Sequence, residues 1–171
     1  MDIFVHMCCG PCSISPVEIL EREGYKVTGY YFNPNIHPID EHIRRKENLE
    51  IVSKNMNFSV IYSDSFKQEI WEGFSGDIKD RCEMCYRMRL EEITRTAKEK
   101  GYKYFTTTLL VSPYQNHELL KDIAKEMQDK YGIEFVYYDF REGFREGQSK
   151  AKEMGIYRQK YCGCLPSKRY M

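Results

Sequence analysis

The chain has 171 residues, which suits one compact domain, and its 26 basic residues balance 26 acidic ones. A net charge of zero excludes a protein that holds nucleic acid by bulk charge alone, although a local basic face remains compatible with it. The N-terminal residues lack the basic start and long apolar run of a signal peptide, and no segment approaches the ~20 apolar residues that span a bilayer. We therefore expect a cytoplasmic protein with no membrane partner.

Strands and helices are expected to alternate along the chain. Runs of β-branched, aromatic and other apolar residues predict strands at 2–7, 25–32, 57–62, 104–108 and 134–138. Helical spacing of apolar residues, with glycine after several of the segments, predicts helices at 13–23, 39–55, 66–74, 82–100, 117–131 and 142–154. Residues 156–171 are expected to form an irregular tail.

This alternation predicts one three-layer α/β domain over residues 1–171, with an open, mostly parallel five-stranded sheet. The expected fold is Rossmann-like, of the nucleotide-binding α-hydrolase-like kind. In such folds the functional site lies outside the C-terminal strand ends, where the strand order reverses. A cysteine-rich segment directly follows the first expected strand, so we expect the site there.

Seven cysteines stand in three groups separated by long stretches without cysteine. In chain order they are Cys8, Cys9 and Cys12, then Cys82 and Cys85, then Cys162 and Cys164. Cytoplasmic thiols stay reduced and seven is an odd number, so a framework of structural disulfides is not expected. Groups gathered from distant parts of a chain indicate metal ligands or redox thiols.

The first group lies in HMCCGPCS, residues 6–13, where a Gly-Pro turn leads from strand to helix. Cys9 and Cys12 are expected near the helix N-terminus, where the dipole and unpaired N–H groups favour thiolates. The adjacent side chains of Cys8 and Cys9 are expected to point in different directions. His6 is expected either beside the site or as a satisfied structural residue. The sequence CGPC also matches the thioredoxin tetrapeptide, so a thiol–disulfide oxidoreductase that uses Cys9 and Cys12 is the main alternative.

The second group, Cys82 and Cys85, forms a C-x-x-C motif that lets two thiolates reach one metal or cluster from one helix turn. Arg81, Arg87 and Arg89 lie nearby and would either offset thiolate charge or form a solvated face. Two cysteine pairs suit a 4Fe-4S cluster and a structural zinc equally well. A zinc-stapled RNA-binding domain without catalysis is therefore a third interpretation, although a domain of this length does not need a zinc to fold.

The third group is Cys162-Gly-Cys164, in which glycine permits a tight loop. The pair is expected to form an easily reduced disulfide or to bind a second metal, unless these are two incidental surface thiols. Tyrosines and cations in residues 157–170 suit nucleobase stacking and phosphate binding, or ordinary packing. The polar loop at residues 110–116 is expected either to hold a substrate or to turn the chain and cap a helix.

With these motifs in hand, the chain resembles the cobalamin-independent epoxyqueuosine reductases, the QueH family. Five segments carry the resemblance in order and over nearly the full length. They are M-CCGPCS at 7–13, F-NPNIHP at 32–38 with E-x-x-RR after it, D-RC-x-x-CY-x-x-RL at 80–90, TTTLLVSPYQ at 106–115 and YRQ-x-Y-CGC at 157–164.

The resemblance implies a two-electron reductive deoxygenation of epoxyqueuosine to queuosine at the wobble position of tRNA, the last step of queuosine biosynthesis. The implied partners are the anticodon loop that carries epoxyqueuosine and an unidentified electron donor. Cys162 and Cys164 would be a redox-active pair or ligands of a second, mononuclear iron, and Cys12 a metal ligand or a proton donor. The implied ligands of a 4Fe-4S cluster are Cys8, Cys9, Cys82 and Cys85.

Overall fold

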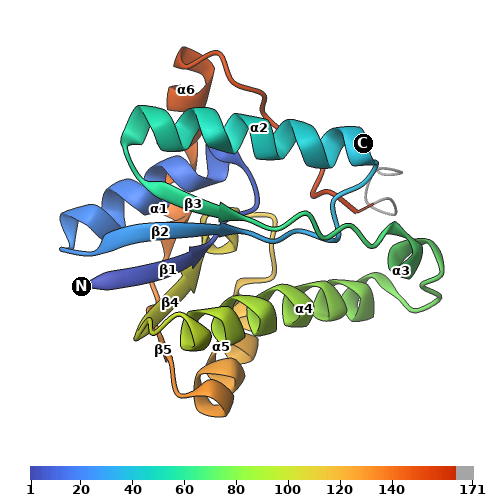
Figure 1. Cartoon of the computed structure of the whole chain (residues 1–171). Helices are drawn as coiled ribbons and strands as arrows, with labels where there is room; N and C mark the ends of the chain where they lie inside the picture. The colour runs from blue at the N-terminus through green and yellow to red at the C-terminus, as the bar shows by residue number, and fades with distance from the viewer. Residues whose placement is uncertain (165–171) are drawn as a thin grey trace.

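The computed structural model describes residues 1–164, in which strands and helices alternate (Figure 1). The strands are β1 (Asp2–His6), β2 (Lys26–Tyr31), β3 (Ser59–Tyr62), β4 (Tyr104–Thr107) and β5 (Glu134–Phe135). The helices are α1 (Gly10–Arg22), α2 (Ile39–Met56), α3 (Gln68–Glu72), α4 (Ile78–Glu99), α5 (His117–Tyr131) and α6 (Phe144–Glu153). Two 3-10 helices complete the set, η1 (Thr108–Val111) and η2 (Phe140–Gly143).

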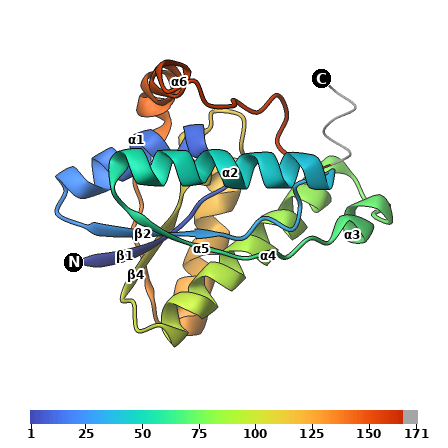
Figure 2. The same ribbon diagram turned by 45° about the horizontal axis from the view of Figure 1, so that its top comes forward.

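The strands form one parallel sheet in the order β3-β2-β1-β4-β5. Helices α1, α2 and α6 cover one face, and α4 and α5 cover the other (Figure 2). The expected three-layer α/β fold with an open parallel sheet is therefore confirmed. The chain adds β2 and β3 on one side of β1 and then returns to place β4 on the other, so the strand order reverses between β1 and β4.

The central strand β1 carries the core of the sheet. Its consecutive residues Ile3, Phe4 and Val5 are all fully buried, which is typical of a parallel strand covered by helices on both faces. Burying each side chain of this size stabilises the fold by about 1.5–3 kcal/mol. The C-terminal end of β1 is thus a rigid base for the residues that follow it.

Two helices begin earlier than the sequence pattern predicts. Helix α1 starts at Gly10 rather than residue 13, because Pro11 suits a first turn, where a backbone N–H has no partner to lose. Helix α4 starts at Ile78 rather than residue 82, because the Asp77 side chain accepts a hydrogen bond from the Asp80 N–H at 2.8 Å and caps the helix. The C-x-x-C cysteines therefore lie beyond the first turn of α4.

Two C-terminal elements also differ from expectation. Strand β5 spans two residues instead of five, because only Tyr104 and Phe105 of β4 pair with it. The segment expected as one helix at 142–154 divides into the end of η2 and α6. Within residues 1–164, no helix is both long and apolar enough to cross a membrane.

Candidate metal and redox site

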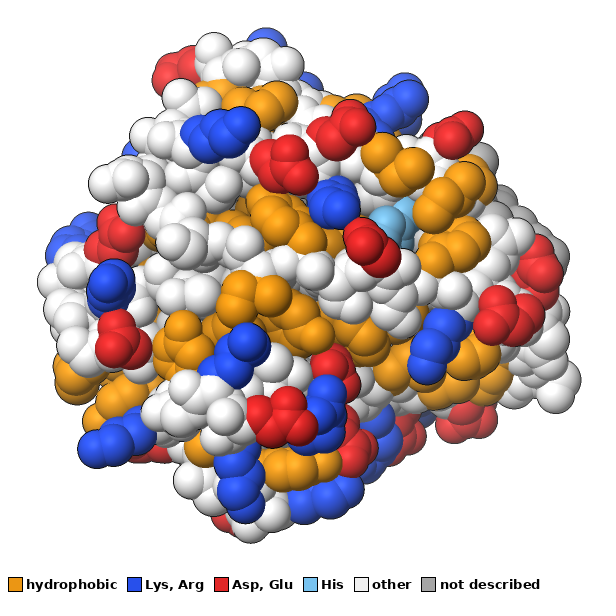
Figure 3. Space-filling model, in the orientation of Figure 1, with side chains coloured by type: hydrophobic (Ala, Val, Ile, Leu, Met, Phe, Trp, Pro, Cys, Tyr) orange, Lys and Arg blue, Asp and Glu red, His pale blue; other side chains and the backbone are white. Residues whose placement is uncertain are grey.

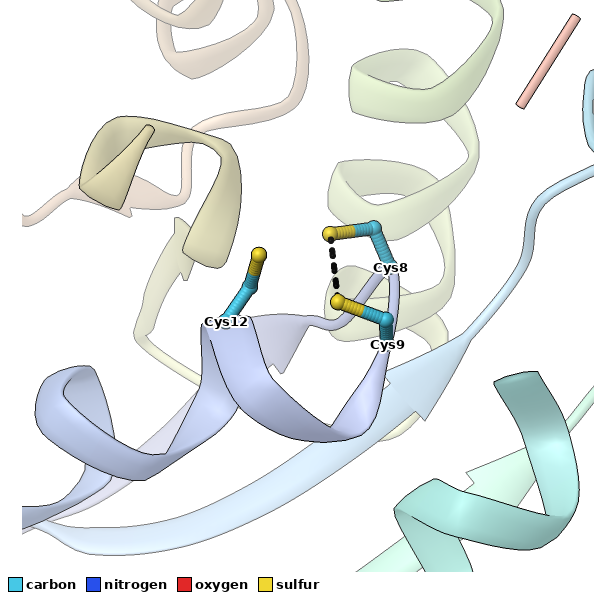
Figure 4. Close-up of side chains that lie close together, drawn as sticks. All are labelled: Cys8, Cys9 and Cys12. Carbon is cyan, nitrogen blue, oxygen red and sulfur yellow. Dashed lines mark hydrogen bonds between the residues drawn. The ribbon is translucent and has the colours of Figure 1, made fainter. Parts of the chain in front are cut away.

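The first cysteine group lies where β1 ends and α1 begins, at the reversal of strand order. The sulfur atoms of Cys8, Cys9 and Cys12 all lie within 4.8 Å of one another, and all three residues are buried. Cys8 Sγ and Cys9 Sγ stand 3.8 Å apart (Figure 4). The expectation that these two side chains diverge is wrong, because the chain turns from strand to helix between them and carries both sulfurs toward Cys12.

The loop that follows β4 closes this group from the neighbouring strand. Thr108, at the start of η1, accepts a hydrogen bond from the Cys8 N–H at 3.4 Å, and its Oγ1 lies 3.7 Å from Cys8 Sγ. Both β1 and β4 therefore supply residues to the site. The first group therefore lies at the reversal of strand order, as expected, and its role in the chemistry stays a prediction.

Within the first group, the pKa of Cys8 is lowered whereas those of Cys9 and Cys12, nearest the helix N-terminus, are raised. Interactions with the side chains of Cys12 and Cys9 hold the pKa of Cys8 well below its usual value. Burial raises the pKa of Cys9, and the bond to Cys8 raises that of Cys12. A dry site of this size holds one negative charge far more readily than three.

The second and third cysteine groups come together around another cavity. Cys82 and Cys85 project from α4, and Cys162 and Cys164 belong to the tail. All four line one small cavity of about 20 Å³. Cys162 Sγ and Cys164 Sγ are 3.8 Å apart, a contact between thiols rather than a covalent bond. The fold thus gathers thiols that are about 80 positions apart in sequence.

Arg89 of α4 lies between the two thiol groups. Its side chain is buried, Nη2 lies 3.0 Å from Cys85 Sγ, and its charge also acts on Cys8. Burial raises the pKa of Cys85 to about 11, and Arg89 opposes this rise. Arg87, two positions earlier, instead pairs with Glu83 and with Glu126 of α5 near the surface. The structure therefore assigns charge compensation to Arg89 and a partly solvated face to Arg87.

A larger cavity of about 310 Å³ opens above the first cysteine group. Cys8, Cys12 and Thr108 line it, together with residues from the loop before α5, from α6 and from the tail. The residues shared by the large and the small cavity are Arg89, Gln115 and Cys162. Two adjoining cavities, with a buried cation between them, therefore carry six of the seven cysteines.

The loop before α5 lines a cavity and caps a helix. Ser112, Tyr114 and Gln115 line the large cavity, whereas the Asn116 side chain caps α5 by accepting a hydrogen bond from the Leu119 N–H at 3.1 Å. The expected capping role is thus confirmed for Asn116, and a substrate-holding role for its neighbours stays a prediction.

His6 is a structural residue beneath the site. Its Nε2 faces two acceptors, Phe32 O at 3.1 Å and Asn33 Oδ1 at 3.0 Å, and so carries the proton. Its Nδ1 accepts from Thr107 Oγ1 at 2.9 Å. Burial lowers the pKa of His6 to about 4, so the ring is neutral at pH 7 and ties β1 to the ends of β2 and β4.

The tail is held by residues that the sequence motifs did not single out as functional. Arg45 of α2 donates to the Cys162 and Tyr161 carbonyls at 2.9 and 2.7 Å. Gln159 Nε2 donates to Cys12 Sγ at 3.3 Å. Both residues lie in segments that carry the family resemblance: Arg45 ends E-x-x-RR, and Gln159 ends YRQ. Residues 156–164 form neither helix nor strand, and residues 165–171 lie outside the described part of the chain.

A sequence model of the family "Epoxyqueuosine reductase QueH" matches residues 3–170. The chain belongs to the QueH family. It is 34% identical over 173 residues to the epoxyqueuosine reductase QueH of Thermotoga maritima, covering 95% of this chain and 88% of the relative. It is 33% identical over 166 residues to that of Dehalococcoides mccartyi, covering 96% and 91%. The resemblance inferred from the motifs is thereby confirmed.

Solved structures share the fold of this QueH chain at low sequence identity. A deacetylase–teicoplanin complex aligns with a TM-score of 0.55 at 10% identity, covering 90% of this chain and 86% of that one. A protein described as a predicted subunit of tRNA methyltransferase from Methanocaldococcus jannaschii aligns with a TM-score of 0.50 at 15% identity, covering 90% and 74%. At these identities the likeness concerns the α/β architecture alone.

The thiols of this QueH chain fit a metal or cluster bound by cysteine. Among residues 1–164, Cys8, Cys9 and Cys12 hold their sulfur atoms within 4.8 Å of one another, close enough to ligate one metal ion. Cys82 and Cys85 line the small cavity together with Arg89, whose charge also acts on Cys8. A buried cation beside thiolates offsets the negative charge that several cysteine ligands bring to a cluster. The assignment of individual cysteines as ligands stays a prediction.

Proposed function

We propose that this chain reduces epoxyqueuosine to queuosine at the wobble position of tRNA. Members of its family are named epoxyqueuosine reductases, so the chain is an oxidoreductase. The observation that carries the proposal is the match to this family over residues 3–170. Thiols gathered beside a cavity at the reversal of strand order support it. We place the reaction in the cytoplasm, where thiols stay reduced.

The proposed cofactor is a 4Fe-4S cluster. Four cysteine thiolates are its usual protein ligands, and when bound it supplies electrons one at a time. Arg89 supports the assignment because it is buried, lies 3.0 Å from Cys85 Sγ and also interacts electrostatically with Cys8, so it offsets thiolate charge from both pairs. The proposed ligands are Cys8, Cys9, Cys82 and Cys85.

A second redox group is proposed because the reaction needs two electrons. The epoxide takes up two electrons and two protons, loses both C–O bonds and yields an alkene and water. Cys162 and Cys164 can supply two electrons and two protons by closing to a disulfide, or they can help to hold a mononuclear iron. Their place in a cavity that adjoins the large one supports either role. Cys12 lines the large cavity with its sulfur held by Gln159, and is proposed to protonate the departing oxygen or to bind the metal.

Two alternatives are less well supported. A thiol–disulfide oxidoreductase that uses Cys9 and Cys12 needs no other cysteines, so it would leave the four cysteines around the small cavity unexplained. A structural zinc would leave unexplained why Cys8, Cys12 and Cys162 border a cavity of about 310 Å³.

The test is purification without oxygen, followed by the visible spectrum, the iron and sulfide content, and an assay on tRNA that carries epoxyqueuosine. We expect broad absorbance near ~400 nm and conversion of epoxyqueuosine to queuosine when a reductant is supplied. A colourless protein with stoichiometric zinc and no product under these conditions would contradict the proposal.

A further inference from the structure

Tyr114 is the most exposed of the large apolar side chains among residues 1–164, with 85% of its surface open to solvent. It lies at the mouth of the large cavity and meets Phe144 of α6 edge-on, with ring centroids 6.0 Å apart. An exposed aromatic ring beside a functional cavity is a typical feature of a recognition surface.

The loop that carries Tyr114 is hydrogen-bonded within itself and to Tyr86 of α4. The Tyr114 N–H donates to Ser112 Oγ at 3.2 Å, and the Asn116 N–H donates to Tyr86 OH at 3.1 Å. Tyr86 also donates to Gln115 Oε1 at 2.5 Å. The ring is therefore presented to solvent by a fixed backbone, so little ordering entropy is lost when a flat partner covers it.

The cavity beneath Tyr114 has room for one nucleoside and not for a folded RNA. Its volume of about 310 Å³ lies at the lower end of the roughly 300–1,000 Å³ typical of small-molecule sites. Cys8 and Cys12 lie on its wall, so a reacting base has to enter it. Enzymes that act on a base inside a nucleic acid take the nucleotide out of its stack. The neighbouring bases then remain outside, at the level of the cavity mouth.

The tyrosines of the tail are already engaged within the protein. Tyr157 OH donates to Glu41 Oε1 at 2.9 Å, and Tyr161 OH donates to the His37 carbonyl. The sequence suggested these two rings either as nucleobase partners or as packing residues, and in the structure their hydroxyl groups hold the tail to α2 and to the loop before it. Residues 168–170 of the same segment lie outside the described part of the chain. Tyr114, by contrast, presents its ring to solvent.

We propose that Tyr114 is a stacking platform for a nucleobase that flanks the modified nucleotide, and that the substrate is recognised as a single-stranded RNA loop. The inference rests on the proposed function. Exposed Lys160 lines the same cavity and offers a cation to the RNA backbone. Basic and acidic side chains are interspersed on the face seen in Figure 3, and the net charge is zero. Because basic residues do not outnumber acidic ones in the chain, we expect stacking to carry much of the affinity and the salt dependence to be shallow.

The test measures fluorescence anisotropy of an unmodified RNA hairpin with a single-stranded anticodon loop, titrated with the purified holoprotein. We expect the hairpin to bind more tightly than a blunt RNA duplex of the same composition. Tyr114→Ala is expected to weaken hairpin binding about tenfold, because loss of one base–aromatic stack has effects of that order. Tyr114→Phe retains the ring and is expected to bind within about twofold of wild type.

Tyr131→Ala is the matched control, because Tyr131 ends α5 at the opposite end from the cavity and its hydroxyl donates to Glu91. It is expected to bind the hairpin as wild type does. Unchanged affinity in Tyr114→Ala, equal losses in the alanine and phenylalanine variants, or equal binding of hairpin and duplex would each overturn the inference. Because the probe lacks epoxyqueuosine, its binding is independent of reduction. Reduction of epoxyqueuosine without hairpin binding would defeat the inference and leave the proposed function intact.

Discussion

Arg45 and Cys162 are 117 positions apart in sequence, and the Arg45 guanidinium donates a hydrogen bond to the Cys162 carbonyl at 2.9 Å. Arg45 is only 2% exposed and is paired through its Nε with Glu41 at 2.9 Å. The same guanidinium donates to the Tyr161 carbonyl. One buried ion pair on α2 thus fixes the segment that carries the Cys162–Cys164 pair.

Arg45→Met removes this anchor and leaves Glu41 buried without its partner. We expect the free energy of unfolding to fall by about 3–5 kcal/mol, the usual cost of breaking a buried pair. We also expect Cys164, which is buried in the wild type, to react faster with an alkylating reagent under native conditions. Urea titration and mass spectrometry measure the two effects. Arg95→Met, in an exposed ion pair, is the control, and Cys164 alkylation at the wild-type rate in Arg45→Met would contradict the role of the anchor.

Gly163→Ala tests how closely the same segment packs against Arg45 and Ile36. Gly163 has φ +131°, and an added Cβ would lie 2.9 Å from Ile36 Cγ1 and 3.1 Å from Arg45 Nη1. We expect a loss of unfolding free energy greater than about 1 kcal/mol. Gly155→Ala is the matched control, because Gly155 also has positive φ (+70°) but open space around it. Equal losses in the two variants would show that backbone conformation alone, and not the contact with α2, explains the glycine.

Arg89→Gln is expected to raise the pKa of Cys85 further. Burial already raises this pKa to about 11 and the guanidinium opposes the rise, so removing the cation leaves the thiolate less stable. The rate of Cys85 alkylation as a function of pH in metal-free protein measures the change. Arg87→Gln is the control because its ion pairs face Glu83 and Glu126. A profile for Arg89→Gln that overlays the wild-type profile would rule out this electrostatic contact.

His6 predicts a specific loss of stability in acid. The pKa of His6 is about 4 in the folded protein and 6.5 in the unfolded chain. The folded state disfavours protonation, so the contribution is present above pH 6.5 and is lost as the pH falls toward 4, by about 3 kcal/mol in total. Unfolding titrations across this range are expected to give a shallower pH dependence for His6→Gln than for wild type. Equal slopes would mean that His6 does not contribute to it.

Replacing Cys162 and Cys164 by serine tests the proposed second redox group. We expect the rate of epoxyqueuosine reduction to fall by at least about 100-fold, because the change removes a group that supplies electrons to the reaction. A 100-fold loss corresponds to an increase of only about 2.8 kcal/mol in the barrier. Hairpin binding and the cluster absorbance are measured alongside as controls. Turnover at the wild-type rate in the double variant would refute an essential role for the pair.

The sequence by itself determined the alternation of strands and helices, the cysteine-rich turn at the end of β1 and membership of the family. Local periodicity and motif order carry this information, because they depend on residues close together in the chain. Helix starts at Gly10 and Ile78 were missed by three or four residues, since caps depend on single side chains such as Asp77.

Only the tertiary structure decided which residues face one another. It brought the sulfurs of Cys8, Cys9 and Cys12 together, turned Arg89 toward the thiols while Arg87 met surface acids, and left Tyr114 exposed. A sequence pattern shows that a face is buried or charged but not which distant segment covers it. That choice follows from the packing of helices on the sheet, which sets contacts across more than a hundred positions.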